Sequence, residues 1–557
     1  MKSANAIPFR LRIGVTGHRE LADPEAIARK VKEFVEKELP ELFDNPAAVR
    51  AHLENPDRRT EIVYTVITPL AEGADRLVAH SILNIAPASR LRAVLPFPRE
   101  EYLKDFGSEA SRREFESLYQ LDADPLPPRN SLSLDNMDEK SRAQERSKAY
   151  LAAGILVVEQ CDLLIAVWDG EKARGKGGTA EIIAYAEERG RPLVKIFTSG
   201  RGNEINRGAG LKWQSLNRIE EFNAHPITAE EISLYTENVY NQLFANSPGA
   251  MLDPAMLGEV RSRLLPGYAR ASIIAKHNRK LYHRAGQIVY LLSPVAVLAV
   301  AIGVLFRRLA PYALALEALI LILILLLIFS ANRMKVLKKW IENRALAEHI
   351  RAGIFTTACG FMPRSLANQA AQATILQSDD WIMRLLNEMM SGFRPPSRCS
   401  DETCSAAISF VRTMWIDEQI AFHANNFTRS DRISRFLERA GMIIFLAAIA
   451  AAIIHLLTLP SPDEIGVHLT EKLIIILAIV LPAAGASIGG FRTHGEYSRL
   501  AKRSQSMKTV LTELRSRFVY FAAPETLAEY LREIESVMLE ENKDWIVLMR
   551  HIELSPV

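Results

Sequence analysis

Cysteine is scarce in this sequence, and its charge is nearly balanced. The 557 residues include four cysteines, Cys161, Cys359, Cys399 and Cys404, with no C-x-x-C pair among them. Disulfide frameworks and zinc modules need cysteines at short, paired spacing, so we expect neither and interpret these residues as reduced thiols. Lys and Arg number 68 against 65 for Asp and Glu, a net charge of +3. This balance gives no general attraction to nucleic acid, and we expect no direct nucleic-acid binding.

Several familiar signatures are also missing. The sequence has neither a G-x-G-x-x-G fingerprint nor a complete Walker A loop, so we expect no NAD binding in the Rossmann manner and no P-loop NTPase. The N-terminal stretch MKSANAIPFRLRIGVTGHR lacks the apolar core of a secretory signal, so we expect no cleaved leader. No cofactor and no metal are expected.

Long apolar runs, by contrast, are abundant. Four of them are long enough to cross a hydrocarbon core of about 30 Å at about 1.5 Å per residue. A bundle of four membrane spans is therefore predicted. The spans are 286–306, 309–330, 440–459 and 473–490.

The flanking charges predict the orientation of these spans. Basic residues cluster before the first and third spans and after the second and fourth, which the positive-inside rule places in the cytoplasm together with both termini. Arg307 and Arg308, the tight connection of the first pair, oppose the rule but are outnumbered. The cytoplasmic set is Lys276, Arg279, Lys280, Arg284, Arg333, Lys335, Lys338, Lys339, Arg432, Arg435, Arg439, Arg492, Arg499, Lys502 and Arg503.

The two span pairs look like repeats. YHRAG (282–286) precedes the first span and LERAG (437–441) begins the third, an offset of 155 residues. Arg344 and Arg499 follow the two pairs at the same offset. We therefore predict two two-span units, 268–395 and 406–557, divided by an exposed loop at 392–405.

Few residues inside the spans carry polar chemistry. Glu317 carries the only charge inside them, and His455 is the only other imidazole or carboxylate; both are candidates for lining an aqueous path. For Glu317 the alternative is that its side chain reaches toward the nearby outer face of the membrane. Gly485 and Gly489 have the G-x-x-x-G spacing that lets helices approach closely, with a pore-lining role as the alternative.

Residues 9–198 alternate strand-like apolar runs with helical patterns, which predicts an α/β fold with a parallel, Rossmann-like sheet. Residues 199–267 read as a helical connector, with helices near 229–245 and 254–264. The predicted strands are 11–16, 62–68, 91–95, 161–168 and 193–197, and the predicted helices are 24–39, 74–83, 141–160 and 179–189.

Three loops after predicted strands have the composition of a phosphate site. Glycine lets the backbone approach an anion, and the amides and dipole of a helix N-terminus attract negative charge. Because the carboxyl ends of parallel strands share one edge, we expect the loops to form a single nucleotide pocket. Their residues are Thr16, Gly17, His18 and Arg19; Glu72, Gly73, Ala74 and Asp75; and Asp169, Gly170, Lys176, Gly177, Gly178, Thr179 and Glu181.

Further candidates lie near the same edge. Arg99 leaves the third strand, and Arg146 and Tyr150 stand at the start of a helix, where Tyr150 would stack on a base. His18 has no Cys, Ser or Asp close to it in the sequence, so we interpret it as a hydrogen-bonded loop residue rather than a catalyst.

Three motifs resemble the SLOG superfamily, which is named for Smf/DprA proteins and the LOG phosphoribohydrolases. They are GVTGHR (14–19), AEGADRLVA (71–79) and CDLLIAVWDG…ARGKGGTAEIIAYA (161–186), and they span about residues 9–198. GKGGTAE (175–181) is similar to the P-G-G-x-G-T-x-x-E loop of the LOG enzymes, with Lys176 where proline would stand.

The apolar half resembles SLATT domains, two-span effector modules of bacterial conflict systems. The resemblance rests on WIENRALAEHIR (340–351) and WIDEQIAFHANNFTRSDRISRFLERAG (415–441). Together the two resemblances imply an oligomeric effector of antiphage defence in the bacterial inner membrane. Its ligand would be a signalling nucleotide, a cyclic ADP-ribose variant or a cyclic oligonucleotide, made by a separate enzyme, and it would permeabilise or depolarise the membrane.

Two other functions remain open. One is a membrane-anchored nucleotide N-glycoside hydrolase or transferase of LOG type, with Glu181 or Asp169 as the catalytic carboxylate. The other is a transporter with a regulatory domain, which the sparse polar content of the spans disfavours.

Overall fold

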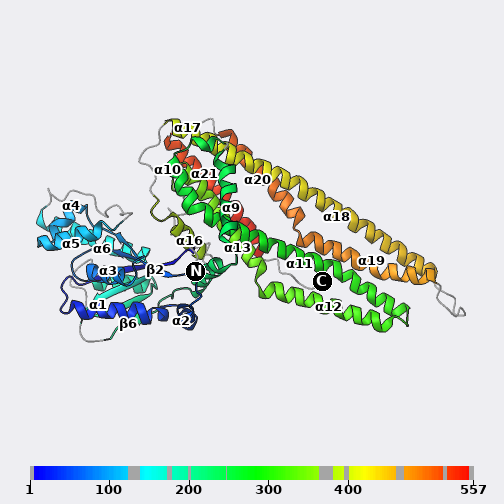
Figure 1. Ribbon diagram of the computed structural model, residues 1–557, viewed down its shortest axis with the longest axis horizontal. Helices are drawn as coiled ribbons and strands as arrows, with labels where there is room; N and C mark the ends of the chain where they lie inside the picture. Colours follow the sequence, from blue (N-terminus) through cyan, green and yellow to red (C-terminus); the bar gives the residue numbers. More distant parts are fainter. Residues whose placement is uncertain are drawn as a thin grey trace. The chain divides into compact units, whose positions relative to one another are not determined.

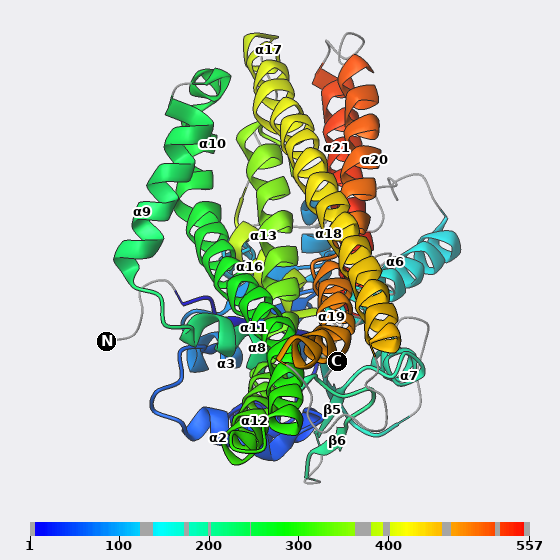
Figure 2. The ribbon, with the colours of Figure 1, turned by 90° about the vertical axis from the view of Figure 1, so that its right-hand side faces the viewer.

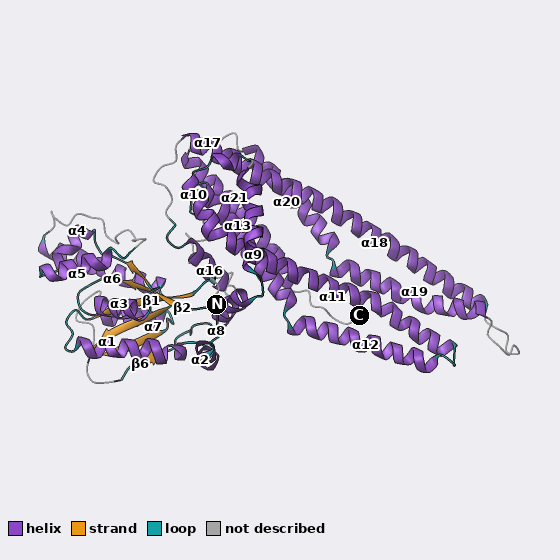
Figure 3. Ribbon diagram, in the orientation of Figure 1, coloured by secondary structure: helices purple, strands orange, loops and turns teal. Residues whose placement is uncertain are grey.

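The computed structural model describes residues 6–122, 138–171, 178–198, 202–245, 247–362, 380–393, 401–458, 469–517 and 524–550. Contacts divide the chain into two units. The first comprises Met1–Pro226 together with Gln377–Phe393, and the second comprises Ile227–Leu376 together with Arg394–Val557. All strands of the described residues belong to the first unit (Figures 1 and 3).

The first unit is built on a six-stranded sheet of order β3-β2-β1-β4-β5-β6. The five predicted strands are confirmed, and they pair in parallel. A sixth strand, β6, pairs antiparallel with β5, so the prediction of a purely parallel sheet was wrong at this edge. The strands are β1 (Phe9–Gly17), β2 (Ile62–Thr68), β3 (Arg90–Ala93), β4 (Leu163–Trp168), β5 (Leu193–Phe197) and β6 (Glu204–Asn206).

Helices cover the sheet because its central strands are apolar on both sides. Leu163 to Val167 of β4 are all buried, as expected for a strand packed between two helical layers. Helix α1 packs on α3 and α6 packs on α7, while β1 contacts α3, α6 and α7. The helices of this unit are α1 (Pro24–Glu33), α2 (Pro46–Glu54), α3 (Ala74–Ile85), α4 (Arg99–Tyr102), α5 (Glu109–Tyr119), α6 (Glu139–Gln160), α7 (Thr179–Glu188), α8 (Trp213–Ala224) and α16 (Asp380–Met390).

The strand order creates a switch point between β1 and β4. From β1 the chain moves outward to β2 and β3, then returns to the other side of β1 to form β4 and β5. Connections therefore diverge at the carboxyl ends of β1 and β4, which is where open α/β sheets bind their ligands.

Helix α16 belongs to this unit although it lies far along the chain. It contacts β1 and α8, and Arg384 pairs with Asp162. The sequence analysis had grouped these residues with the first two-span unit. Residues before and after this segment belong to the second unit.

The second unit is helical throughout its described residues. Four of its helices are long and apolar enough to cross a membrane, and they overlap the four predicted spans. Large apolar side chains such as Leu319, Leu325 and Phe329 are exposed on them, as lipid-facing side chains would be. The helices are α9 (Ala229–Tyr240), α10 (Pro254–Glu259), α11 (Leu265–Leu305), α12 (Ala310–Arg333), α13 (Val336–Ala358), α17 (Asp401–Phe410), α18 (Glu418–Leu457), α19 (Leu469–His494), α20 (Tyr497–Arg517) and α21 (Pro524–Arg550).

The loop predicted at 392–405 is only partly a loop. Helix α17 begins at Asp401, and Cys404 is buried in it. Residues 394–400 lie outside the described residues.

The two span pairs share one backbone feature. Lys335 follows α12 and Glu496 follows α19, and each has a positive φ, 51° and 52°. After each break the next helix packs on the first helix of its own pair, α13 on α11 and α20 on α18 (Figure 2). Arg344 follows Lys335 by nine residues, whereas Arg499 follows Glu496 by three. The two arginines therefore do not occupy matching positions, and the prediction that they are equivalent was wrong.

The two pairs pack against each other through glycines of α11 and α19. A Cβ on Gly286 of α11 would lie 2.1 Å from the His494 ring of α19, and one on Gly490 would lie 2.3 Å from the Tyr290 ring of α11. The G-x-x-x-G glycines differ, because a Cβ on Gly489 would meet nothing within 4 Å and one on Gly485 would make an ordinary contact. Close approach is thus made by the neighbouring glycine, Gly490.

Gly286→Ala is expected to destabilise the packing of α11 on α19. The buried His494 ring has little room to yield, so a cost of about 1–3 kcal/mol is expected from overpacking. Gly441 occupies the matching position of the second repeat, and its Cβ would lie 3.8 Å from Ile488, so Gly441→Ala is the control. Thermal unfolding of the full chain in detergent should show a lower midpoint for Gly286→Ala alone; equal midpoints would contradict this packing.

Candidate functional site

The first two predicted loops meet at the carboxyl ends of β1 and β2. The Ala74 amide donates to the His18 carbonyl at 3.0 Å, and the His18 amide donates to the Val167 carbonyl at 3.3 Å. Gly73 has φ 82°, and a Cβ there would lie 2.1 Å from the Arg19 carbonyl oxygen. Gly17 is equally confined, since its Cβ would lie 2.4 Å from that of Ala74. Both glycines therefore permit close backbone contact between the loops.

His18 and Asp169 come together at the β1–β4 switch point. The Asp169 amide donates to Nε2 of His18 at 3.2 Å, and the Asp169 carboxylate lies 3.2 Å from the same nitrogen. About a third of the His18 side chain and a quarter of the Asp169 side chain remain exposed. Gly170 follows with φ 89°, which turns the chain out of β4. The sequence offered no partner for His18 because Asp169 is distant along the chain.

The third predicted loop contributes the start of α7. Thr179 begins the helix, Gly178 stands at its N-cap position, and the amides of Glu181 and Ile182 bond to the Gly178 carbonyl. Helix α7 contacts both β4 and β1. Because α7 follows β4 directly in the chain, its N-terminus lies on the side of the sheet where β4 ends. Lys176 and Gly177 lie outside the described residues.

Two of the predicted acidic residues have internal partners. Glu72 accepts a hydrogen bond from the Ser111 hydroxyl of α5. Asp75 is buried and accepts one from the Ala71 amide at 3.2 Å. Burial raises the pKa of Asp75 to about 7. Asp75 thus supports the loop from inside, and Glu72 connects it to α5.

A buried arginine that the sequence analysis missed organises the same loop. Arg76 donates to the Leu70 carbonyl at 3.0 Å and to Glu114 at 3.0 Å, and its guanidinium lies 4.4 Å from the centre of the Phe106 ring. Leu70 itself has φ 59°. Arg76 directly follows Asp75, the last residue of the predicted loop. A single arginine at the start of a helix has no periodic pattern that would predict its burial.

Arg19, Tyr150 and Arg146 form one network, as the prediction of a shared edge requires. Arg19 donates to the Tyr150 hydroxyl at 3.2 Å, and that hydroxyl donates to Asp105. Arg146 also pairs with Asp105, and it bonds Glu101 at 3.1 Å. The Tyr150 ring packs against Phe97 in a T-shaped contact, and the stacking of a base on it stays a prediction.

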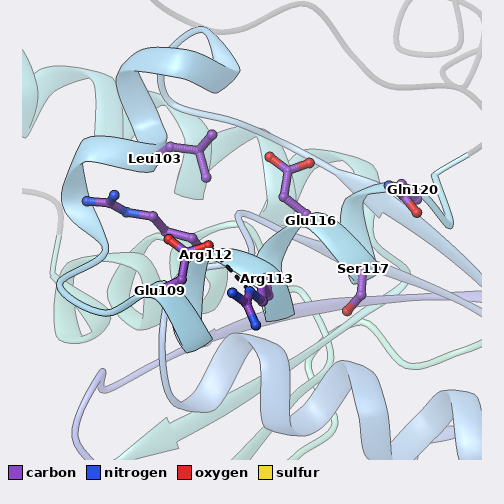
Figure 4. A pocket seen from close by; sticks show the side chains of 7 residues that line it. All are labelled: Leu103, Glu109, Arg112, Arg113, Glu116, Ser117 and Gln120. Atoms are coloured by element: carbon purple, nitrogen blue, oxygen red, sulfur yellow. Dashed lines mark hydrogen bonds and ion pairs between the residues drawn. The ribbon is translucent and has the colours of Figure 1, made fainter.

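Arg99 is not part of this network. It pairs with Glu116 of α5 and is half exposed. Glu116 also lines a shallow hollow of about 320 Å³ on α5, shown in Figure 4. The hollow contains none of the predicted ligand residues, and most of its lining is charged or polar: Leu103, Glu109, Arg112, Arg113, Glu116, Ser117 and Gln120. We therefore place the candidate site at the β1–β4 edge.

Metal-ligating chemistry is sparse in the part of the chain that the structure describes. No group of three or more His, Cys, Asp or Glu side chains gathers there as a metal site would require. Cys161 is a buried free thiol whose pKa is raised by burial to about 12, so it is not a reactive group.

Comparison with models of known protein families finds no match, and comparison with curated protein sequences finds none either.

Gly73→Ala is expected to disrupt the junction of the two loops. A left-handed backbone and a carbonyl at 2.1 Å both exclude a Cβ, so a loss of at least about 1–3 kcal/mol is expected. Gly107→Ala, where a Cβ would meet nothing within 4 Å, is the matched control. Denaturant unfolding of the two full-length variants should separate them, and equal stability would refute the close contact.

Asp75→Asn is expected to reduce the pH dependence of stability. Because the folded-state pKa of about 7 exceeds the ordinary value of 3.8, the folded chain keeps a proton that the unfolded chain releases. Stability is therefore lost as the pH rises from about 4 to 7, by roughly 4 kcal/mol from this group. The unfolding free energy should therefore change less between the two ends of this pH range in Asp75→Asn than in the wild type. Identical pH dependence would show that Asp75 is ionised in the folded chain.

Proposed function

We propose that this chain is a membrane effector gated by a nucleotide. The observation that carries the proposal is the convergence of His18, Arg19 and the α7 N-terminus at the β1–β4 switch point, in a chain with four span-length apolar helices. A Rossmann-like unit of this kind would recognise the ligand, and the spans would act on the bilayer.

The chemistry of the edge suits a phosphorylated ligand. Arg19 is exposed, and its guanidinium can pair with a phosphate while it keeps its bond to Tyr150. The backbone amides at the start of α7 carry partial positive charge and can also bind a phosphate. Gly17 and Gly73 have no side chains, so the backbone of the two loops stays accessible. A cyclic ADP-ribose variant or a cyclic oligonucleotide carries the required phosphates.

The spans supply the effector. Glu317 lies half-buried on the face of α12 defined by the buried residues Ala313, Ile320 and Ile324. An acidic side chain within a span is costly unless it serves a polar path, so we propose that Glu317, with His455, lines a pore. By this proposal both termini lie in the cytoplasm, which the basic flanks favour, and a pore would require a homo-oligomer. By this proposal the protein permeabilises or depolarises the bacterial cell membrane in antiphage defence, in response to a nucleotide made by another enzyme.

The second candidate is the nucleotide N-glycoside hydrolase or transferase. One observation favours it: the His18 imidazole sits against the Asp169 carboxylate, with Glu181 one turn into the adjoining helix. Such a pair can move a proton to or from a leaving group. The spans would then serve as an anchor.

A binding titration of the full chain in nanodiscs distinguishes these functions. Cyclic ADP-ribose isomers, cyclic oligonucleotides and linear nucleotides would each be titrated by calorimetry, and the ligand then checked by chromatography. Tight binding of intact ligand supports the sensor, whereas product that disappears in Glu181→Gln supports the enzyme. No binding across the panel would refute both.

Arg19→Gln is expected to weaken binding of the responsive nucleotide about 10- to 100-fold, the worth of one charge-assisted hydrogen bond. Arg113 is exposed on α5, where it pairs with Glu109 in the next turn, so Arg113→Gln is the control and should bind as the wild type does. Equal losses in both variants would point to a non-specific charge effect instead of a site.

A further inference from the structure

Helix α16 is anchored to the sheet by a buried charge cluster. Asp162 is 4% exposed and lies between two guanidiniums, with Arg12 at 2.9 Å and Arg384 of α16 at 2.9 and 3.0 Å. Burial alone would raise the pKa of Asp162, but the two guanidiniums overcome it and hold that pKa far below its ordinary value. The carboxylate is thus ionised between two guanidiniums, one from β1 and one from α16.

A second ion pair fixes the other end of α16. Arg10 of β1 makes a two-pronged contact with Glu388, with Nε at 2.6 Å and Nη2 at 3.0 Å from the two carboxylate oxygens. Arg90, at the start of β3, lies 3.4 Å from Glu388. Bidentate geometry of this kind defines orientation as well as attraction.

The apolar face of α16 completes the docking. Its buried side chains recur at helical spacing, and Trp381 packs against Phe222 of α8 with ring centres 6.3 Å apart. The Arg384 guanidinium also covers the Phe9 ring at 5.2 Å. The buried set is Trp381, Ile382, Leu385, Leu386, Met389 and Met390.

These contacts all fall at the amino ends of β1 and β4. Arg10 and Arg12 lie near the start of β1, and Asp162 immediately precedes β4. The same two strands end at Gly17–Arg19 and at Asp169, the candidate ligand site. Strands β1 and β4 are paired from Ile13↔Leu163 to Gly17↔Val167, so one parallel ladder connects the α16 contacts with the candidate ligand site.

The chain continues from both ends of α16 into the second unit, which holds the two span pairs. We propose that α16 is the coupling element of the protein: ligand binding at the carboxyl edge shifts β1 against β4, and α16 passes this shift to the segments that lead to each span pair. This inference rests on the proposed gating function.

The test measures nucleotide-evoked dye leakage from liposomes that contain the full chain. The nucleotides are the cyclic ADP-ribose isomers and cyclic oligonucleotides of the titration, and the variants are Arg10→Glu, Glu388→Arg and the double exchange. Each single reversal should reduce evoked leakage about tenfold, a typical allosteric coupling, with nucleotide binding unchanged. The double exchange should restore leakage in part, because the ion pair forms again with its charges reversed while Arg90 still faces position 388. Arg113→Glu, on exposed α5, is the control for altered charge.

Hydrogen exchange of the same samples reports docking directly. In the single variants the amides of 380–390 should lose protection while those of β2 and α3 keep it, which separates undocking from misfolding. Glu388→Gln, a milder change, should give intermediate leakage and protection if a single reversal fails to fold.

Each remaining outcome overturns a distinct claim. If no nucleotide evokes leakage in the wild type, the gating function fails and the coupling fails with it. If the wild type responds and an undocked variant responds equally, only the coupling is refuted. Leakage without nucleotide in the undocked variants would also refute it, because α16 would then restrain the spans instead of transmitting a signal.

Discussion

A single ionised carboxylate in the interior holds the first unit together. Asp162 accepts hydrogen bonds from the backbone and guanidinium of Arg12 and from both terminal nitrogens of Arg384. A buried charge is tolerated only when such partners surround it, and removal of one partner from a buried pair costs about 3–5 kcal/mol. Asp162 thus joins the start of β4 to β1 and to α16, next to the first pair of the β1–β4 ladder, Ile13↔Leu163.

Local patterns in the sequence were enough to predict the elements. The run Leu163–Trp168 and the amphipathic helices could be predicted because the spacing of apolar residues within a short segment indicates strand or helix. The four spans were the clearest case, since length and apolarity alone define them. Strand β6 was not predicted because it has three residues, two of them polar, and so short a segment shows no alternation of apolar and polar side chains.

Long-range pairings were beyond the reach of such patterns. His18 meets Asp169, Arg12 and Arg384 share Asp162, and Arg19 meets Tyr150 only once the sheet has formed. The idea that loops after parallel strands converge predicted that Arg19, Gly73 and Asp169 would gather, but not that Arg99 would turn away to Glu116. The repeat likewise matches Gly286 with Gly441, yet of these two Gly286 lies against a ring of the other pair and Gly441 does not. Packing of that kind depends on which side chain arrives from elsewhere.

The discontinuity of the first unit has a consequence for biosynthesis. Its last helix, α16, is translated more than 150 residues after Pro226, the end of its main segment. At about 5–20 residues per second, the ribosome takes roughly 10–30 s to cover that interval. During this time the first two span-length helices, α11 and α12, are translated, and Asp162 has no Arg384 to bind. Completion of the first unit therefore comes after the first pair of span-length helices has been translated, so this unit cannot reach its finished state ahead of them.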